Sequence, residues 1–289
     1  MTALRDTGWA KLNLTLEVLG RRADGFHELR SLVAFASLGD EVEFDPHGSL
    51  ELAVEGRFAQ ALGSDNLIVK AARAASSKVP GLKLGRFRLV KMLPVAAGLG
   101  GGSADAAAAL RLMGRANDDA LNDAMLAELA TRLGSDVNVC LTSRPALVSG
   151  RGERVKPVAG FPPCGVLLAN PGRPLATEAV YAALGVEAWA GSLSGQAERL
   201  DFRGDFEALL AYVTPRGNDL ERPGAQLVPE IREVLAALLA LDGVRLARLS
   251  GSGPTCFALF ASGDAAGRAG ARLAAEFPSW WVAASALGA

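Results

Sequence analysis

A glycine-rich segment in the first half of the chain has the residue types that hold a phosphate group. Four glycines fall within positions 98–102 of the run Pro94-Val95-Ala96-Ala97-Gly98-Leu99-Gly100-Gly101-Gly102-Ser103-Ala104. Glycine lets backbone N–H groups approach an anion because it has no Cβ. The alanine-rich run that follows favours a helix starting near Ser103, and helix N-termini attract anions. The segment therefore predicts a phosphate-binding loop in a nucleotide-using enzyme.

Two other phosphate-binding templates do not fit this segment. The Walker A pattern requires Gly-Lys followed by Ser or Thr, and nothing of this kind follows Gly98. The dinucleotide fingerprint requires a third glycine where Ser103 stands, directly after a strand, and here Pro94 intervenes. The alternative that stays open is a tightly packed glycine turn without a ligand.

Lys11 and Asp136 are the candidate catalytic residues. Phosphoryl transfer needs a phosphate cradle, a cation and a group that orients or deprotonates the acceptor hydroxyl. Asp136 follows a predicted helix end in Gly134-Ser135-Asp136, where a turn or capping role is the alternative. Lys11 lies in the alternating run 10–18, which predicts a half-buried strand with Lys11 and Asn13 on its polar face. A solvated lysine is the alternative there.

Composition narrows the class of protein. The chain has 289 residues, a net charge of −1 and 21% charged residues, so no basic field points to nucleic acid or to an anionic membrane. No apolar run approaches the roughly 18 residues of a spanning helix, and the N-terminus does not resemble a signal peptide. Cys140, Cys164 and Cys256 are widely spaced, which predicts reduced thiols in a cytoplasmic protein. With only two histidines, a His-rich metal site is excluded.

Strand-like and helix-like runs are intermixed along the whole chain, which predicts a two-domain α+β fold. A Pro- and Gly-rich stretch at 157–163 marks the expected boundary between domains 1–157 and 158–289. Besides 10–18, we expect strands at 31–35, 41–44, 50–54, 87–93, 146–149, 165–169, 244–249, 256–260 and 280–284. We expect helices at 67–77, 103–115, 121–133, 177–184, 205–212, 229–241 and 264–277, a loose segment at 191–195 and a glycine turn at 250–254.

The glycine loop resembles the ATP loop of the GHMP small-molecule kinases. The N-terminal runs Ala-Lys-Leu-Asn (10–13) and Gly-Arg-Arg-Ala-Asp-Gly-Phe-His-Glu-Leu (20–29) narrow the resemblance to one group of that family. Further matches stand at 133–137, 218–221 and 250–253, so the resemblance spans nearly the whole chain. It implies a GHMP-kinase-like fold of two domains with the active site in the cleft between them. In that group the acceptor is the tertiary 2-hydroxyl of a methylerythritol that carries a cytidine diphosphate, on the non-mevalonate route to isoprenoids.

The resemblance also implies roles for individual residues. Asp136 takes or orients the hydroxyl proton, Lys11 stabilises charge, and residues 94–104 hold ATP, whose phosphates Mg²⁺ would bridge. The sequence shows no ligands for that metal. The loop at 138–140 departs from the family because Asn138 stands where proline is usual. The resemblance assigns substrate binding to Asn13, Phe26, His27, Thr177 and Tyr181, and places Asn66 near the adenine, where a helix cap is an equal account.

A cytosine stacked between Phe26 and Tyr181 is the expectation that separates this group from other GHMP kinases. Phe26 could instead fold into the core beside a surface histidine. A homoserine- or mevalonate-type kinase would not need this aromatic pair, whereas a catalytically silent nucleotide-binding regulator would not need Lys11 or Asp136. We expect a monomer or a weak homodimer that binds neither nucleic acid nor membrane.

Overall fold

The computed structural model describes residues 3–118, 120–189 and 199–288. Within these ranges the chain forms two compact units. The first unit contains residues 1–11, 38–95 and 100–143, and the second contains 12–37, 96–99 and 144–289. The boundary expected at 157 stays a prediction, and the segment expected to be loose at 191–195 lies outside the described residues.

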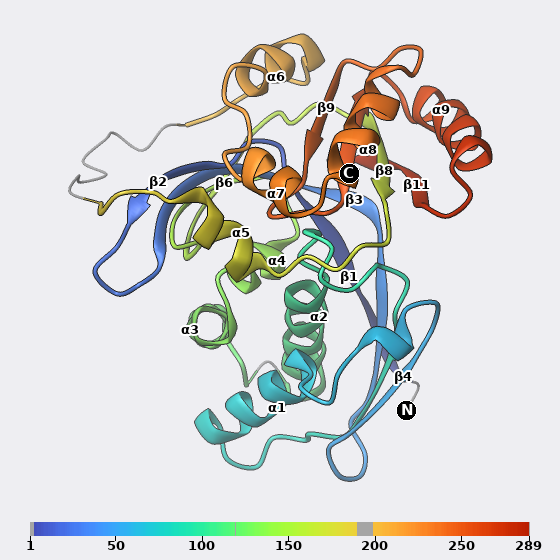
Figure 1. The fold of residues 1–289 in the computed structure, drawn as a ribbon. Helices are drawn as coiled ribbons and strands as arrows, with labels where there is room; N and C mark the ends of the chain where they lie inside the picture. The colour runs from blue at the N-terminus through green and yellow to red at the C-terminus, as the bar shows by residue number, and fades with distance from the viewer. Residues whose placement is uncertain (1–2, 119, 190–198, 289) are drawn as a thin grey trace. The chain divides into compact units, whose positions relative to one another are not determined.

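The first unit packs helices on one face of a small sheet (Figure 1). In this unit β4 (Glu51–Glu55) pairs in parallel with β5 (Arg86–Val90), and β5 pairs antiparallel with the second half of β3 (His27–Asp45). Apolar side chains of these strands, among them Phe44 and Phe87, share one core cluster with the helices that follow. Those helices are α1 (Leu67–Lys78), α2 (Gly101–Ala116), α3 (Asp123–Leu133) and α4 (Val137–Thr142).

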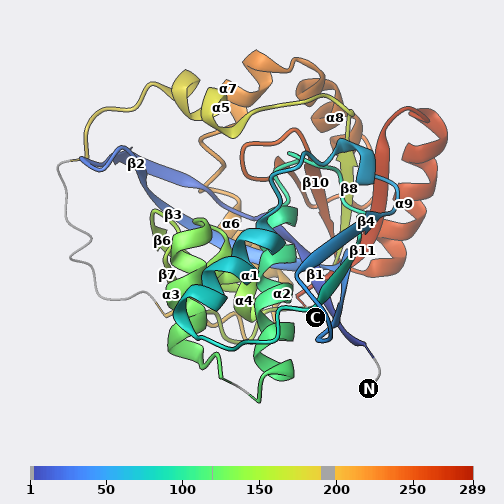
Figure 2. The ribbon, with the colours of Figure 1, turned by 90° about the horizontal axis from the view of Figure 1, so that it is seen from below.

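The second unit is an antiparallel sheet covered by helices. Its central strands follow the order β11 (Trp281–Leu287), β8 (Cys164–Asn170), β10 (Cys256–Phe260) and β9 (Leu246–Leu249). One face packs against α8 (Glu230–Leu239) and α9 (Gly263–Glu276) in a single core cluster, and α9 is seen beside β11 in Figure 2. The remaining elements are β2 (Glu17–Arg21), β6 (Ala146–Gly150), β7 (Arg154–Pro157), α5 (Thr177–Leu184), α6 (Phe206–Val213) and α7 (Glu221–Leu227).

Most of the expected elements are present, with shifted ends. Asn66 caps α1, because its side-chain oxygen accepts a hydrogen bond from the Ile68 N–H at 2.8 Å. Helix α2 begins at Gly101, two residues before the expected start, and α3 begins after its cap at Asn122. The strands expected at 31–35 and 41–44 are parts of the one long strand β3. Among the described helices, none has the length and apolar character needed to cross a membrane.

The single half-buried strand expected over 10–18 is wrong. Strand β1 (Leu4–Asn13) ends at Asn13, and β2 begins only at Glu17. The alternating polar side chains do not face water either, because Lys11, Asn13 and Thr15 are 4%, 5% and 1% exposed. Period-two alternation predicts a wet face only where nothing covers that face. Here Lys11, Asn13 and Thr15 each bond to a partner elsewhere in the fold instead.

Helix α7 is not among the expected helices, and its sequence contains Pro223-Gly224. Proline is tolerated in the first turn of a helix, where its missing N–H would have no intrahelical acceptor. Pro223 is the third residue of α7, and both Pro223 and Gly224 are buried. Gly224 allows Leu249 to approach, since a Cβ there would lie 3.3 Å from a Leu249 methyl group. Packing therefore overrides the local propensity.

Candidate active site

Lys11 and Asp136 form an ion pair in the first unit. The Lys11 Nζ lies 2.8 Å from the Asp136 Oδ2. The lysine side chain is 5% exposed, whereas the aspartate side chain is 42% exposed. A buried ammonium thus faces a carboxylate whose outer part is open to a substrate. The alternative of a solvated lysine on an outer face is excluded.

The backbone of α4 presents the Asp136 side chain without using it as a cap. Asp136 precedes the first residue of α4, yet its carboxylate accepts no capping hydrogen bond from that helix. The alternative of a capping aspartate is thereby excluded. Asn138 lies in the first turn of α4 and donates a hydrogen bond from its side chain to the Thr131 hydroxyl at 2.9 Å, so it fastens this turn to α3. Two residues further on, burial raises the pKa of the Cys140 thiol, which excludes a reactive thiolate.

The glycine loop meets Lys11 at Gly100. Gly100 is the N-cap of α2 and has a left-handed backbone with φ of 62°. A Cβ at Gly100 would lie 3.3 Å from two carbons of the Lys11 side chain. The first N–H groups of α2 have no acceptor within the helix. They follow directly after Gly100, which contacts the Lys11 side chain. In the first unit, therefore, the ammonium, the carboxylate and the anion-attracting end of α2 converge.

In the second unit, the tip of the glycine loop packs against the turn at 250–254. A Cβ on Gly98, which has φ of +75°, would lie 2.2 Å from the Ser250 carbonyl oxygen. The Ser250 hydroxyl donates to the Gly98 carbonyl at 3.0 Å, and the Thr255 N–H donates to the Ala97 carbonyl at 3.2 Å. The second glycine turn therefore lies beside the tip of the loop.

Asn218 holds the second glycine turn in place, a role that the sequence did not reveal. Its side-chain amide donates to the Leu249 carbonyl at 2.9 Å and to the Gly251 carbonyl at 2.8 Å. Its side-chain oxygen accepts from the Leu220 N–H at 2.9 Å, which sets the turn into α7. The family match at 218–221 was the available sequence signal for Asn218. Residue spacing does not predict which distant turn a buried amide side chain will bond to.

The aromatic candidates of the substrate site lie in the second unit. Phe26 is 45% exposed, so the alternative of a core phenylalanine is excluded. The Arg151 guanidinium lies 4.9 Å from the centre of the Phe26 ring. His27 stacks on Tyr181 with ring centres 4.6 Å apart and planes 26° apart. The protein itself thus pairs His27, rather than Phe26, with Tyr181. Burial lowers the pKa of His27, and the Arg21 charge adds to the effect.

The remaining substrate candidates are Thr177 and Asn13. Thr177 and Tyr181 are one turn apart on α5, and the Thr177 hydroxyl is 2.9 Å from the Ser252 hydroxyl. The Asn13 amide donates to the Ser31 hydroxyl at 2.8 Å. A Cβ on Gly251 would lie 3.2 Å from the Asn13 side-chain oxygen. Both residues therefore lie at the turn 250–254, which links them to the tip of the glycine loop.

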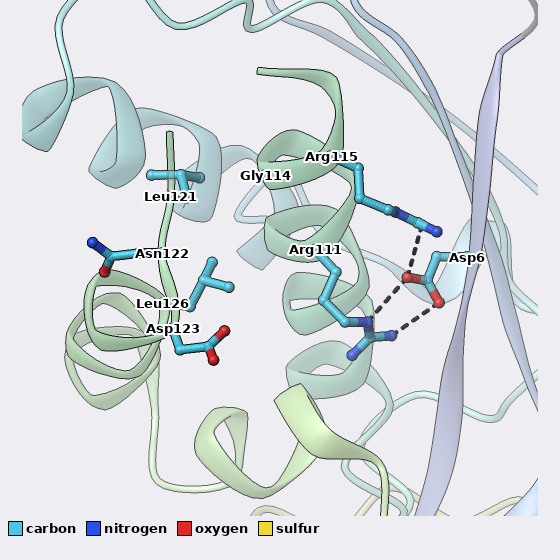
Figure 3. Close-up of a pocket in the computed structure, with 8 residues that line it drawn as sticks. All are labelled: Asp6, Arg111, Gly114, Arg115, Leu121, Asn122, Asp123 and Leu126. Carbon is cyan, nitrogen blue, oxygen red and sulfur yellow. Dashed lines mark hydrogen bonds and ion pairs between the residues drawn. The ribbon is translucent and has the colours of Figure 1, made fainter. Parts of the chain in front are cut away.

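Within the first unit, a hollow lies beside the C-terminal half of α2, away from Gly101 (Figure 3). It has a volume of about 560 Å³. Arg111 and Arg115 point from α2 to Asp6 and pair with its carboxylate at 3.0 and 3.1 Å. At about 1.5 Å per residue, these arginines lie roughly 15–20 Å along the helix from Gly101. The hollow is lined by Asp6, Arg111, Gly114, Arg115, Leu121, Asn122, Asp123 and Leu126.

Comparison with known proteins agrees with this geometry. Residues 66–144 match the model of the GHMP kinases N terminal domain, and residues 199–279 match that of the GHMP kinases C terminal. A 4-diphosphocytidyl-2-C-methyl-D-erythritol kinase from Rhodopseudomonas palustris (strain BisB5) is 47% identical over 99% of this chain and 100% of its own. The relative of that name from Methylobacterium radiotolerans is 47% identical over 99% of this chain and 100% of its own.

Solved structures give the same result. A crystal structure of 4-(cytidine 5'-diphospho)-2C-methyl-D-erythritol kinase has a TM-score of 0.77 and 34% identity, covering 99% of this chain and 100% of its own. A mevalonate kinase from L. major has a TM-score of 0.68 at 17% identity, covering 98% of this chain and 96% of its own, and shows the fold alone. This chain therefore belongs to the GHMP kinases, among the 4-diphosphocytidyl-2-C-methyl-D-erythritol kinases.

Proposed function

We propose that this chain transfers the γ-phosphoryl group of ATP to the 2-hydroxyl of 4-diphosphocytidyl-2-C-methyl-D-erythritol, a step toward isoprenoid precursors. The observation that carries the proposal is the Lys11–Asp136 ion pair of 2.8 Å beside Gly100 at the start of α2. A GHMP kinase needs these three features in one place. The names of relatives at 47% identity supply the acceptor.

Asp136 is the proposed general base. Its exposed carboxylate accepts the proton of the acceptor hydroxyl as the oxygen forms its bond to the γ-phosphorus. The bond from that phosphorus to the β,γ-bridging oxygen breaks, and ADP leaves. Lys11 holds Asp136 in position and offsets the negative charge that accumulates on the transferring group. The proton passes from Asp136 to solvent after release.

Residues 94–104 are the proposed nucleotide loop. The first N–H groups of α2 and the Ser103 hydroxyl donate to phosphate oxygens, and the helix dipole adds to their attraction. Asn66 is already engaged as the cap of α1, so it contributes to the adenine pocket by holding the start of that helix.

The side chains at this site would hold Mg²⁺ only together with the nucleotide, whose phosphates would supply most of the ligands. Among the described residues no three His, Cys, Asp or Glu side chains form a metal-binding group. Mg²⁺ in kinases is typically bound by one or two carboxylates together with phosphates and water, and Asp136 is the exposed carboxylate at this place. When bound, the ion would neutralise phosphate charge.

We propose that the cytosine of the substrate stacks in the aromatic cluster of Phe26, His27 and Tyr181. The 26° angle between His27 and Tyr181 shows a stacked pair, and such surfaces accept a further flat ring. Stacking of a base on an aromatic side chain contributes about 1–3 kcal/mol. The uncharged His27 imidazole, favoured by its lowered pKa, can donate or accept a hydrogen bond at the base edge.

We also propose a cytoplasmic location. Cys140, Cys164 and Cys256 are free thiols, and all three are buried, as expected for a protein of a reducing compartment. The oligomeric state, a monomer or weak homodimer, stays a prediction.

One experiment tests the function directly. Purified protein with Mg²⁺ and ATP is given the cytidyl substrate, homoserine or mevalonate, and the release of ADP is measured. We expect turnover with the cytidyl substrate alone. Turnover with homoserine or mevalonate instead would identify a different GHMP kinase, and nucleotide binding without transfer to any of the three would favour the silent regulator.

A further inference from the structure

Three charged side chains are buried together beneath the glycine loop, in the first unit. Asp40, Lys91 and Asp105 are 0%, 2% and 3% exposed. The Lys91 Nζ donates to the Asp40 Oδ2 at 2.5 Å and to the Asp105 Oδ2 at 2.8 Å. Nothing in the chemistry of transfer uses this cluster, because the base and its cation are Asp136 and Lys11. Its function must lie elsewhere.

The cluster joins the two ends of the loop. On the entry side, the Asp40 Oδ1 accepts hydrogen bonds from the Met92 N–H at 2.6 Å and from the Leu93 N–H at 2.8 Å. These are the last residues before Pro94. On the exit side, Asp105 belongs to the second turn of α2. The Lys91 ammonium therefore bridges the strand that delivers the chain into the loop and the helix that receives it.

Gly101 makes room for this bridge. A Cβ at Gly101 would lie 3.0 Å from the Lys91 Nζ and 3.6 Å from the Asp40 Oδ2. The ammonium thus lies directly under the first residue of α2, whose N–H is among the proposed phosphate donors. Because Gly101 has no side chain, it leaves room for the Lys91 ammonium on one side and for a phosphate on the other.

Stability alone is a poor explanation for the cluster. Buried ions lose their hydration, and replacing a buried ion pair by apolar side chains is often neutral or stabilising. The strain of burial is visible here: desolvation raises the pKa of Asp105 to about 7 against the opposing pull of Lys91. One oxygen of Asp105, Oδ1, has no hydrogen-bond partner among the described residues. Because burying these charges costs free energy, we expect the cluster to fix the positions of the chain segments that it joins.

We propose that Lys91, Asp40 and Asp105 position the nucleotide loop, with Lys91 fixing the distance between the loop entry at 91–93 and the start of α2. The inference rests on the proposed binding of ATP by residues 94–104. Lys91 acts through the loop, so it is a positioning residue. Its loss should weaken ATP binding while the cytidyl substrate, held by residues of the second unit, binds as before.

The test compares Lys91→Met, Asp105→Leu and Asp105→Asn. The asparagine keeps an oxygen that can accept from Lys91, whereas leucine, of similar size, cannot. Arg111→Met is the matched control because it removes an ion pair of α2 with Asp6, far from the loop. For each variant, calorimetry with ATP, calorimetry with the cytidyl substrate, and melting temperature are measured.

We expect Lys91→Met and Asp105→Leu to weaken ATP binding about ten- to a hundredfold, the loss expected when one hydrogen bond to a charged phosphate oxygen is broken. Asp105→Asn should stay within about threefold of the wild type. Arg111→Met should lower the melting temperature and leave ATP affinity unchanged.

Equal ATP affinity for the Asp105→Leu and Asp105→Asn variants overturns the proposal. So does an equal loss of affinity for ATP and for the cytidyl substrate. If Lys91→Met does not fold, the Leu and Asn comparison decides alone. Failure of the wild type to phosphorylate the cytidyl substrate refutes the proposed acceptor and leaves this ATP-binding test intact.

Discussion

At the scale of single residues, the site depends on one exposed carboxylate held by one buried ammonium. Lys11 is 5% exposed, and its partner Asp136 is 42% exposed. The burial of Lys11 keeps its charge close to Asp136 and away from competing water, which strengthens the interaction. The exposed part of Asp136 is what an acceptor hydroxyl can reach.

Replacing Asp136 by asparagine keeps the shape and removes the base. We expect Asp136→Asn to lower kcat by about 10²–10⁴, the usual contribution of general acid–base catalysis, with ATP still bound. Steady-state kinetics and ATP calorimetry check this, with Asp123→Asn, an exposed carboxylate of α3, as the matched control. A kcat close to that of the wild type would remove Asp136 from the mechanism.

Tyr181 distinguishes cytosine stacking from a purely structural role. Tyr181→Ala should weaken the cytidyl substrate about ten- to a hundredfold, because about 1–3 kcal/mol of stacking is lost. Tyr181→Phe should keep the affinity. Tyr181 also packs against the core of the second unit, so the alanine variant will melt earlier. Unchanged cytidyl affinity despite a lower melting temperature would leave Tyr181 a core residue only.

Asp105 gives a pH dependence of stability whose sign follows from its pKa. Burial raises this pKa from 3.8 to about 7 in the folded protein. Between these values the folded state binds more protons than the unfolded state, so the free energy of unfolding falls as the pH rises. We expect Asp105→Asn to remove this contribution. Urea unfolding at pH 5, 6, 7 and 8 should show the wild type losing stability relative to the variant, and parallel curves would contradict the assignment.

At the scale of elements, two glycines of the loop 94–104 each have a close neighbour within their own unit. Gly98 approaches the turn 250–254 within the second unit, and Gly100 approaches Lys11 within the first. Both have a left-handed backbone, which a residue with a Cβ adopts at a cost. Glycine is therefore needed at both positions for the backbone conformation and the close packing, in addition to leaving space for a ligand.

Gly98→Ala tests the shape of the loop. The added Cβ would lie 2.2 Å from the Ser250 carbonyl oxygen, so the backbone must shift and ATP affinity should fall by about tenfold or more. Gly114→Ala is the control on α2, since its Cβ would make only ordinary contacts at 3.6 Å. Calorimetry with ATP measures both variants. An unchanged affinity for Gly98→Ala would place the nucleotide elsewhere.

At the scale of the whole molecule, ligand binding should appear as added stability. A ligand that binds only the folded state at about 100 times its Kd adds roughly 2.7 kcal/mol to the free energy of unfolding. We expect ATP and the cytidyl substrate each to raise the melting temperature, and homoserine and mevalonate to leave it unchanged. Thermal unfolding with each ligand gives the measurement, and a shift with homoserine would contradict the proposed acceptor.

The sequence by itself determined the features that depend on local chemistry. Glycine spacing and the alanine-rich run predicted the loop and the helix that follows it, because backbone freedom and helix propensity are properties of neighbouring residues. A helix cap was one of the two roles expected of Asn66, and Asn66 does cap α1. The family motifs added Lys11 and Asp136, which the structure places in contact.

Tertiary structure alone decided which polar residues are buried and with whom. The alternation at 10–18 predicted a wet face, yet Lys11, Asn13 and Thr15 are buried against partners 17 to 125 residues away. No sequence pattern marks Asp40, Lys91 and Asp105 as a cluster, because Lys91 is 51 residues from Asp40 and 14 residues from Asp105. The physical reason is that a buried charge is tolerated only with a partner, and that partner is chosen by the packing of the chain.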